Sequence, residues 1–295
     1  MSEAKAIKGP LPRAAFYDLA RLFAFRSALD GLRQEGLPRA VSVETPGAAR
    51  TRRVGILPGS FNPPTIAHIE LARHARELFG LDTIVFALSR ITVDKEKIEG
   101  LILEDRLLLL YLIAQDLGGT AVAVVNQGLY YEQARAFRAF LGSNARISFI
   151  VGLDKLVQIF DARYYQDRET ALGVLLTETQ LLVAMRGALG IGDVEALLSR
   201  RENEPYRDRV FPFSLPDDMK GLSSTSVRGR VAAGESFHED VPEVAAAFIA
   251  ETGAYLPRYQ LRARVFDRLY AARAETANFL DLLEQEELNY REASR

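Results

Sequence analysis

One stretch of this chain combines residue types that suit phosphate binding. Residues 54–68 read Val-Gly-Ile-Leu-Pro-Gly-Ser-Phe-Asn-Pro-Pro-Thr-Ile-Ala-His, which is an apolar run, a turn and the start of a helical pattern. Gly59 allows a close backbone approach to a ligand or a positive φ, and Thr65 is a suitable helix N-cap. His68 follows three residues after this cap, so its side chain is expected to point back towards the strand end. Backbone N–H groups, a positive helix end and an imidazole would thus meet at a phosphate site.

A second stretch carries related chemistry. Residues 221–228 read Gly-Leu-Ser-Ser-Thr-Ser-Val-Arg. Ser223, Ser224 and Thr225 precede an expected helix and can cap it or donate to phosphate. Arg228 can fork onto phosphate oxygens. Alone, such a stretch is also an ordinary helix start, but its position after the last expected strand favours a second wall of the same cleft.

Both stretches lie where short apolar runs alternate with helical patterns. Expected strands are residues 53–57, 83–88, 120–125, 146–151, 180–185 and 210–213. Expected helices are residues 65–78, 104–117, 131–140, 153–160, 194–200, 226–233 and 242–251. This alternation predicts an α/β fold with a Rossmann-like, doubly wound parallel sheet. Such sheets bind ligands at the carboxyl ends of their strands, where the strand order reverses.

The two ends of the chain differ from this region. Residues 12–37 have apolar positions at helical spacing and predict an amphipathic helix, and residues 44–50 read as a linker. We expect a helical N-terminal extension at 1–50, a main domain at 51–256 and a helical C-terminal extension at 257–295. The C-terminal helix either packs on its own domain, joins two copies in a homo-oligomer through terminal helices, or belongs to an accessory module.

Composition excludes several classes of protein. The 295 residues include 37 Lys and Arg, 39 Asp and Glu, three His and no Cys. Without cysteine there is no disulfide framework, iron–sulfur cluster or thiol nucleophile. A net charge of −2 disfavours nucleic-acid binding, which needs a basic surface. No apolar run approaches the roughly 18 residues of a membrane helix, and the N-terminus lacks the pattern of a secretion signal. We expect a soluble, cytoplasmic protein with no membrane partner.

The two stretches resemble signatures of the nucleotidyltransferase superfamily, in the branch of nicotinamide and nicotinate mononucleotide adenylyltransferases. That branch shows Gly-Ser-Phe-Asn-Pro-x-Thr/His-x-x-His and a late Ile-Ser-Ser-Thr-x-x-Arg, which stands here as Leu-Ser-Ser-Thr-Ser-Val-Arg at 222–228. Residues 149–154, Phe-Ile-Val-Gly-Leu-Asp, resemble its apolar strand followed by Gly-x-Asp. The likeness covers about residues 53–256. It implies adenylyl transfer from ATP to a pyridine mononucleotide, forming the dinucleotide and pyrophosphate.

The resemblance also implies how ATP is held. The backbone amides of the turn would hold phosphates or the pyridine nucleotide, in particular those around Gly59, Ser60 and Phe61. Thr65, at the end of this turn, belongs to the same phosphate-binding set. His68 would contact the α-phosphate and stabilise charge in the transition state. The β- and γ-phosphates would be held by the late motif, with its residues Ser223, Ser224, Thr225 and Arg228.

Further residues follow from the same likeness. Asp154 would accept hydrogen bonds from the adenosine ribose, with Gly152 leaving room. A lysine after the second strand would reach phosphate, Lys97 being the first candidate and Lys95 the second, although residues 94–99 also fit a solvated charged loop. Mg²⁺ would be carried mainly by the ATP phosphates.

The acceptor side departs from the family. A Trp after the Gly-x-Asp helix commonly stacks on the pyridine ring there, and this chain has no Trp. Tyr164 or Tyr165 would stack instead, or would only cover a hydrophobic loop, and Asn62 is a further acceptor-binding candidate. The choice between nicotinate and nicotinamide stays open. Rival functions are a nucleotidyltransferase with another phosphorylated acceptor and a nucleotide-binding sensor without turnover.

Overall fold

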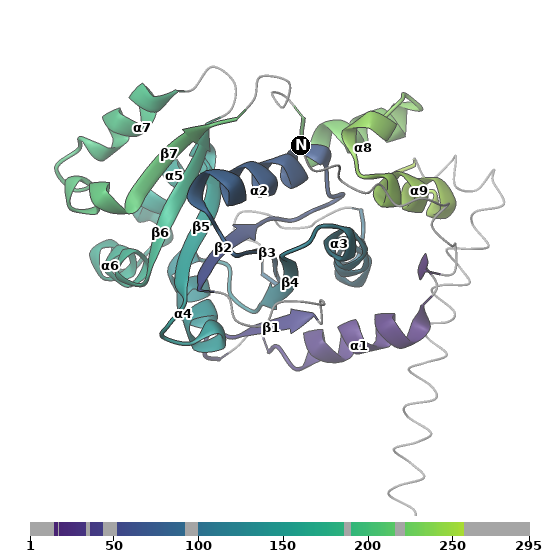
Figure 1. Cartoon of the computed structure of the whole chain (residues 1–295), viewed down its shortest axis with the longest axis horizontal. Coiled ribbons are helices and arrows are strands. Elements are labelled where there is room, and N and C mark those ends of the chain that lie inside the picture. Colours follow the sequence, from purple (N-terminus) through teal and green to yellow (C-terminus); the bar gives the residue numbers. More distant parts are fainter. Residues whose placement is uncertain are drawn as a thin grey trace, which may run out of the picture.

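A seven-stranded sheet with helices on both faces organises the chain (Figure 1). The computed structural model describes residues 15–16, 18–33, 36–43, 52–91, 100–185, 190–215 and 222–256. The strands are β1 Ala40–Val43, β2 Arg53–Pro58, β3 Thr83–Ser89, β4 Thr120–Val125, β5 Arg146–Gly152, β6 Thr179–Met185 and β7 Val210–Ser214. The helices are α1 Leu19–Asp30, α2 Ile66–Phe79, α3 Leu103–Asp116, α4 Tyr130–Leu141, α5 Leu153–Phe160, α6 Arg168–Glu178, α7 Ile191–Leu198, α8 Ser224–Ala233 and α9 Glu243–Thr252.

The strand order is β1-β4-β3-β2-β5-β6-β7. Strands β2 to β7 pair in parallel, and β1 joins the edge of β4 in antiparallel. The order reverses between β2 and β5, which places the expected ligand crevice at their carboxyl ends. The predicted doubly wound α/β fold is therefore confirmed.

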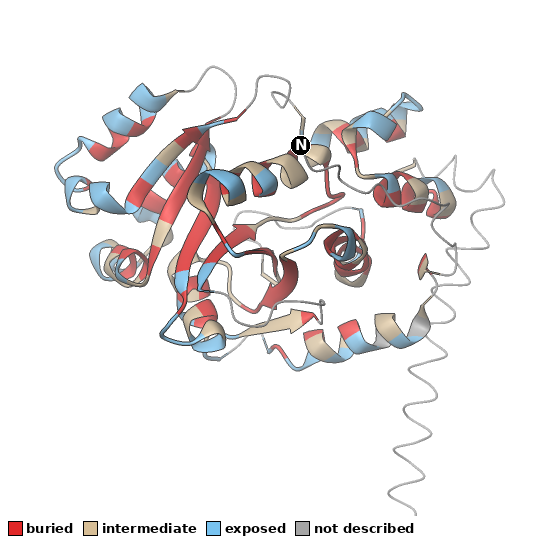
Figure 2. Ribbon diagram, viewed as in Figure 1, coloured by how far each residue is buried: buried red, intermediate tan, exposed pale blue. Residues whose placement is uncertain are grey.

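Side chains that alternate along each strand divide the core between the two faces. One apolar cluster joins the sheet to α4, α5, α6 and α7, and the other joins it to α1, α2 and α3. Strand β3 shows the alternation, since Val85 packs in the first cluster and Phe86 in the second. A third cluster packs α8 and α9 against α3. The inner strands β2 to β6 are buried almost throughout (Figure 2), as parallel strands covered on both faces require.

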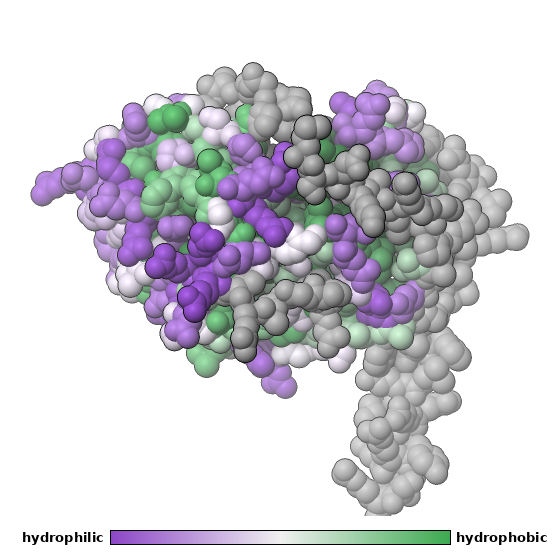
Figure 3. Space-filling view, viewed as in Figure 1, coloured by the Kyte–Doolittle hydropathy of each residue, from purple (hydrophilic) through white to green (hydrophobic). Residues whose placement is uncertain are grey.

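Some large hydrophobic side chains are exposed near the β7 edge of the sheet. Strand β7 ends the sheet opposite β1, and Phe211 on it is exposed, as is Ile191 at the start of α7. Hydrophobic surface shows on this side of the molecule among hydrophilic residues (Figure 3). No helix in the described ranges is long and apolar enough to cross a membrane.

The six expected strands are all present, with ends within one residue of those expected, and the seven expected helices begin and end within three residues of the prediction. Strand β1 and helix α6 were not predicted. The N-terminal helix is shorter than expected, at Leu19–Asp30, and the extension contributes β1 to the main sheet. Four residues are too few for a clear alternation, so β1 depends on the edge of β4 that receives it. The C-terminal extension, Lys95 and Lys97 lie outside the described residues.

Candidate active site

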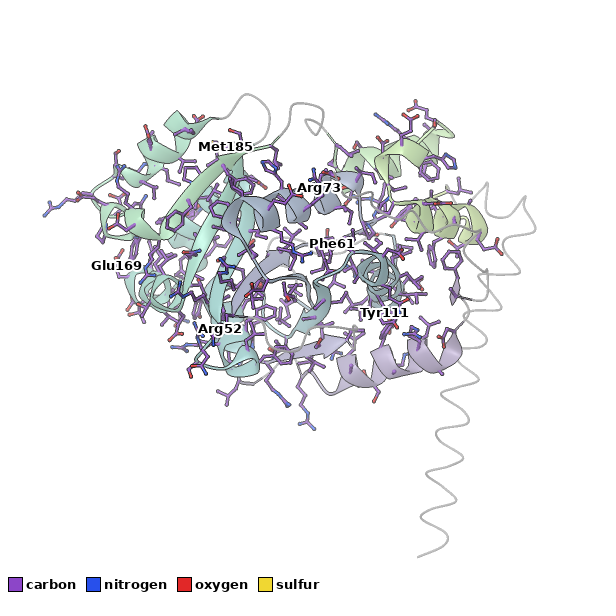
Figure 4. The ribbon with its side chains drawn as sticks, in the orientation of Figure 1. Arg52, Phe61, Arg73, Tyr111, Glu169 and Met185 are labelled. Atoms are coloured by element: carbon purple, nitrogen blue, oxygen red, sulfur yellow. The ribbon has the colours of Figure 1, made fainter. Side chains whose placement is uncertain are left out.

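The turn after β2 is built around a buried phenylalanine. Phe61 is fully buried, with its ring edge-on to Phe86 at 5.6 Å and its centroid 5.0 Å from that of His68. A Cβ on Gly59 would lie 2.8 Å from Cζ of Phe61, so only glycine fits there. The positive φ of the turn, 44°, falls on Phe61 rather than on Gly59. Phe61 lies in the interior of the fold (Figure 4), and this packing holds an uncommon backbone conformation.

The carbonyl groups of the turn are held by side chains from two other helices. The Ser60 carbonyl accepts from Nη1 of Arg106 on α3, at 3.2 Å. On α8, Arg228 Nη1 donates to the Asn62 carbonyl at 2.8 Å. The hydroxyl of Ser224 donates to the Pro63 carbonyl at 2.8 Å. The structure thus brings the two stretches together, although they lie more than 160 residues apart.

His68 is oriented by the N-cap of its own helix. The backbone N–H of Thr65 donates to Nδ1 of His68 at 3.0 Å, and the Thr65 hydroxyl oxygen lies 2.7 Å from the same nitrogen. Because a backbone N–H can only donate, Nδ1 accepts and the neutral ring carries its hydrogen on Nε2. His68 is half-buried, while Thr65 is fully buried. The ring therefore presents a donor on Nε2, the chemistry expected of it from the sequence.

Asn62 forms side-chain hydrogen bonds that hold the turn in place. Its side chain is buried, and Oδ1 accepts from the backbone N–H of Leu101 at 3.0 Å and from the hydroxyl of Tyr255 at 2.7 Å. Acceptor binding by Asn62 stays a prediction, which this buried position disfavours.

The start of α8 forms a second N-terminus beside the turn. Ser223 is the N-cap, its hydroxyl accepting from the backbone N–H of Ser226 at 3.1 Å. Thr225 is exposed and accepts from Nη2 of Arg228 at 3.3 Å. Since the Ser224 hydroxyl donates to Pro63, the donors left on α8 for an anion include its first backbone amides, the exposed Thr225 hydroxyl and Arg228.

The predicted Gly-x-Asp lies across the switch point, where β5 runs into α5. A Cβ on Gly152 would lie 2.6 Å from Oδ1 of Asp154, so glycine leaves space for that carboxylate. Asp154 is exposed in the first turn of α5. Burial raises the pKa of Tyr130 and the charge of Asp154 adds to the effect, so this phenol stays neutral beside the carboxylate.

A pocket of about 180 Å³ opens beside Gly59 and Ser60. Its lining comes from the ends of β2 and β3, the loop after β4, and helices α3, α4 and α5. It also includes both expected tyrosines, Tyr164 and Tyr165. The Tyr165 hydroxyl donates to the Ile159 carbonyl at 2.7 Å, and burial raises its pKa to about 12. The turn thus contacts the pocket through Gly59 and Ser60 at one end and α8 through Asn62 and Pro63 at the other.

Two buried polar residues in this pocket were missed by the sequence analysis. Arg106, 7% exposed, donates to the carbonyls of Ser60 and Ile102, and no described carboxylate accepts a hydrogen bond from it. Burial lowers the pKa of its guanidinium. Gln133, 3% exposed, donates through Nε2 to the carbonyls of Gln127 and Gly128.

The Gln133 Oε1 atom is buried with no hydrogen-bond partner among the described residues. One signal for Arg106 existed in the sequence, since it is a charged residue directly before the eight apolar residues 107–114. For Gln133 no such signal existed. The pocket thus contains a buried guanidinium that bonds only to carbonyls and a buried amide oxygen with no partner among the described residues. Together they suit a ligand with both a negative charge and a hydrogen-bond donor.

The sheet order and this crevice define a nucleotide-binding class of α/β protein, and the chain belongs to the cytidylyltransferase-like family, whose match covers residues 56–230. Three bacterial relatives carry the name "Probable nicotinate-nucleotide adenylyltransferase". The Neisseria meningitidis serogroup B protein is 27% identical over 210 residues, 69% of this chain and 98% of that protein. The Lactiplantibacillus plantarum protein is 26% identical, covering 73% and 93%. The Chromohalobacter salexigens protein is 28% identical, covering 70% and 97%.

Solved structures share the fold. The nicotinic acid mononucleotide adenylyltransferase of Plasmodium falciparum, complexed with APC, has a TM-score of 0.51 at 15% identity. The same enzyme complexed with NaAD has a TM-score of 0.53 at 17% identity. Each comparison covers 69% of this chain and 97% of the other.

Proposed function

We propose that this chain is a nucleotidyltransferase that moves the adenylyl group of ATP to nicotinate mononucleotide. The products are the dinucleotide and pyrophosphate. The observation that carries the proposal is the turn at residues 59–63, which borders the pocket at one end and is bonded to the N-terminus of α8 at the other. A mononucleotide in the pocket and a triphosphate on α8 would therefore meet at this turn. The names of the relatives support the acid rather than the amide as acceptor.

The reaction needs alignment and charge stabilisation. An oxygen of the acceptor phosphate attacks the α-phosphorus of ATP, a new P–O bond forms, and the bond to the bridging oxygen breaks, so pyrophosphate leaves with the electron pair. A phosphate oxygen is already ionised near neutral pH, so no general base is required. His68 donates from Nε2 to the α-phosphate, where charge develops. Because Thr65 fixes the ring in advance, this stabilisation costs no reorganisation during the reaction.

The remaining phosphates lie on α8. Arg228 and the first backbone amides of α8 hold the β- and γ-phosphates, and Ser223 keeps that helix end ordered through its cap. Across the switch point, Asp154 accepts from the ribose hydroxyls of the adenosine. A lysine from residues 95–97 is a further phosphate contact in this proposal.

The acceptor occupies the pocket. The aromatic faces of Tyr164 and Tyr165 pack on the pyridine ring and take the place of the family's Trp. Arg106 holds an anionic group of the acceptor, either its phosphate or its pyridine carboxylate, because its guanidinium is buried without a hydrogen-bonded carboxylate among the described residues.

Mg²⁺ enters on the triphosphate. No three His, Cys, Asp or Glu side chains cluster as a metal site within the described ranges, and a magnesium ion held by phosphate oxygens and water needs no such cluster. The ion neutralises phosphate charge when bound. A cytoplasmic location, the division at residues 50 and 257, and an oligomer through the terminal helices stay predictions.

Pyrophosphate release tests the proposal. The full chain with Mg·ATP is offered nicotinate mononucleotide, nicotinamide mononucleotide and phosphopantetheine in separate reactions. Turnover with nicotinate mononucleotide supports the proposed function. Turnover with phosphopantetheine alone would replace it with another nucleotidyltransferase, and ATP binding without pyrophosphate from any acceptor would favour a sensor.

A further inference from the structure

The loops that form the acceptor pocket are bonded to a part of the chain outside the family match, which begins at residue 56. The N-terminal segment, described at residues 18–33 and 36–43, packs α1 on α3 and pairs β1 with β4. Figure 1 shows α1 and β1 side by side along this edge of the fold. This segment also has polar contacts elsewhere, since Arg26 pairs with Glu104 on α3 and the Ser42 hydroxyl bonds to the Val122 carbonyl. Its residues 29–33 and 36–39, however, hydrogen-bond to the carboxyl ends of β3 and β4.

The first contact is with the loop after β3. Arg90 donates through Nη1 to the carbonyls of Leu29 and Leu32, the second at 2.7 Å. Both carbonyls lie at the end of α1, where helix carbonyls lack partners within the helix. The Arg90 backbone N–H donates to the Val125 carbonyl at 2.9 Å. Arg90 therefore joins α1 to both loops.

The second contact is with the loop after β4, and Asn126 is its centre. Its Oδ1 accepts from the backbone N–H of Arg39 at 2.8 Å, and its Nδ2 donates to the carbonyls of Arg33 at 2.9 Å and Leu37 at 3.1 Å. The backbone N–H of Asn126 donates to the Arg39 carbonyl at 3.2 Å. Asn126 is 1% exposed, so its side-chain hydrogen bonds are shielded from water. All of them go to the N-terminal segment.

These two residues are next to the pocket wall. Ser89 and Ile91 flank Arg90, and Gly128 and Leu129 follow Asn126 closely; all four line the pocket. The Ser89 hydroxyl donates to the Gln127 carbonyl at 2.8 Å and joins the two loops. Gln133 then binds the carbonyls of Gln127 and Gly128, so its unpartnered Oε1 is placed by the same loop.

We propose that residues 29–33 and 36–39 form a built-in support that sets the shape of the acceptor pocket, and that Asn126 is a positioning residue for the acceptor. The inference rests on the proposed function. A support for the whole site would also contact the ATP side, yet none of the hydrogen bonds described for Thr65, Ser224 and Arg228 goes to residues 18–43. Loss of Asn126 thus affects binding of the acceptor and leaves binding of ATP unchanged.

The test compares Asn126→Ala with Ser42→Ala in the full chain. Ser42 is a matched control because its hydroxyl donates to the Val122 carbonyl within the same β1–β4 contact, away from the pocket loops. We expect Asn126→Ala to raise KM for nicotinate mononucleotide by about tenfold or more, up to roughly 10²-fold, since small misplacements carry such costs. KM for ATP should stay within about twofold of wild type, and Ser42→Ala should change neither constant.

Hydrogen exchange supplies a readout that needs no turnover. In substrate-free protein, Asn126→Ala should speed exchange at residues 127–129 and leave residues 223–228 unchanged. If Asn126→Ala does not fold, Arg90→Gln in the loop after β3 replaces it, with the same measurements of KM and of hydrogen exchange. Equal changes in both KM values, or unchanged exchange at 127–129, would overturn the proposal. If the wild-type protein shows no turnover with nicotinate mononucleotide, the proposed function is rejected instead. The hydrogen-exchange result at residues 127–129 would still test whether the N-terminal segment supports the pocket loops.

Discussion

The backbone N–H of Thr65 donates to Nδ1 of His68 across 3.0 Å. This bond fixes both the direction of the ring and the position of its hydrogen, so that Nε2 is a donor before any substrate arrives. In a reaction where an ionised phosphate is the nucleophile, such a donor is more useful than a base.

Replacing His68 by Ala should lower kcat by roughly 10²–10³, the usual cost of one transition-state donor. The matched control is His74→Ala, which removes an imidazole from the same helix α2 and should leave kcat near wild type. Steady-state kinetics with both substrates saturating decides the matter. A near-normal kcat for His68→Ala would remove His68 from the mechanism.

Replacing Arg228 by Ala should raise KM for ATP by about 10- to 100-fold, because hydrogen bonds to charged groups are each worth roughly 1.5–3 kcal/mol. The effect includes the loss of its bond to the Asn62 carbonyl. Arg230→Ala is the control, since Arg230 lies on the same helix but pairs with Asp240. Unchanged ATP affinity in the Arg228 variant would contradict its phosphate role.

Replacing Arg106 by Met should weaken binding of the acceptor and show which anionic group the guanidinium holds. If the group is the pyridine carboxylate, kcat/KM falls for nicotinate mononucleotide and hardly changes for nicotinamide mononucleotide, which lacks that charge. If the group is the phosphate, both values fall together. Unchanged kcat/KM for both acceptors would show that Arg106 only supports the Ser60 carbonyl.

Asp82 gives the fold a pH dependence remote from the site. Its Oδ2 accepts from the backbone N–H groups of Arg53 at 2.8 Å and Arg52 at 3.0 Å, and the Arg53 bond is the main cause that lowers the pKa of this carboxyl. A lowered folded-state pKa means that the stabilisation is complete above the unfolded-state pKa of about 3.9 and is lost as the pH falls through the folded-state value.

Asp82→Ala should therefore lower the free energy of unfolding at pH 7, and the difference from wild type should shrink towards pH 2. Urea unfolding at both pH values measures this difference. Asp208→Ala, at an exposed position, is the control for the loss of a surface carboxylate as such. A difference that is the same at both pH values would contradict the role given to the carboxylate.

Much of the fold follows from local pattern. The parallel strands are continuous apolar runs, and their junctions with α2 and α5 carry glycine and cap residues that mark a turn, so the sequence locates Gly59 and Asp154. The proximity of Arg228 to the first turn also followed, because parallel strands share one carboxyl edge.

The other features depend on contacts between distant residues. Strand β1 is short and its pairing partner lies about 80 residues away. The sequence shows Arg106 only as a charge before an apolar run, and its burial depends on the packing of α3 between the sheet and α9. The hydrogen bonds of Asn62 with Leu101 and Tyr255 could not be predicted from the sequence either. They form only when the turn, the start of α3 and the segment after α9 come together in the fold.

The central claim is the transfer of an adenylyl group to nicotinate mononucleotide, and kcat/KM for the two pyridine mononucleotides, measured with product identification, tests it most directly. We predict one dinucleotide formed per pyrophosphate released, with a higher kcat/KM for nicotinate mononucleotide than for nicotinamide mononucleotide. Protein that binds Mg·ATP yet forms no dinucleotide from either compound would contradict the account.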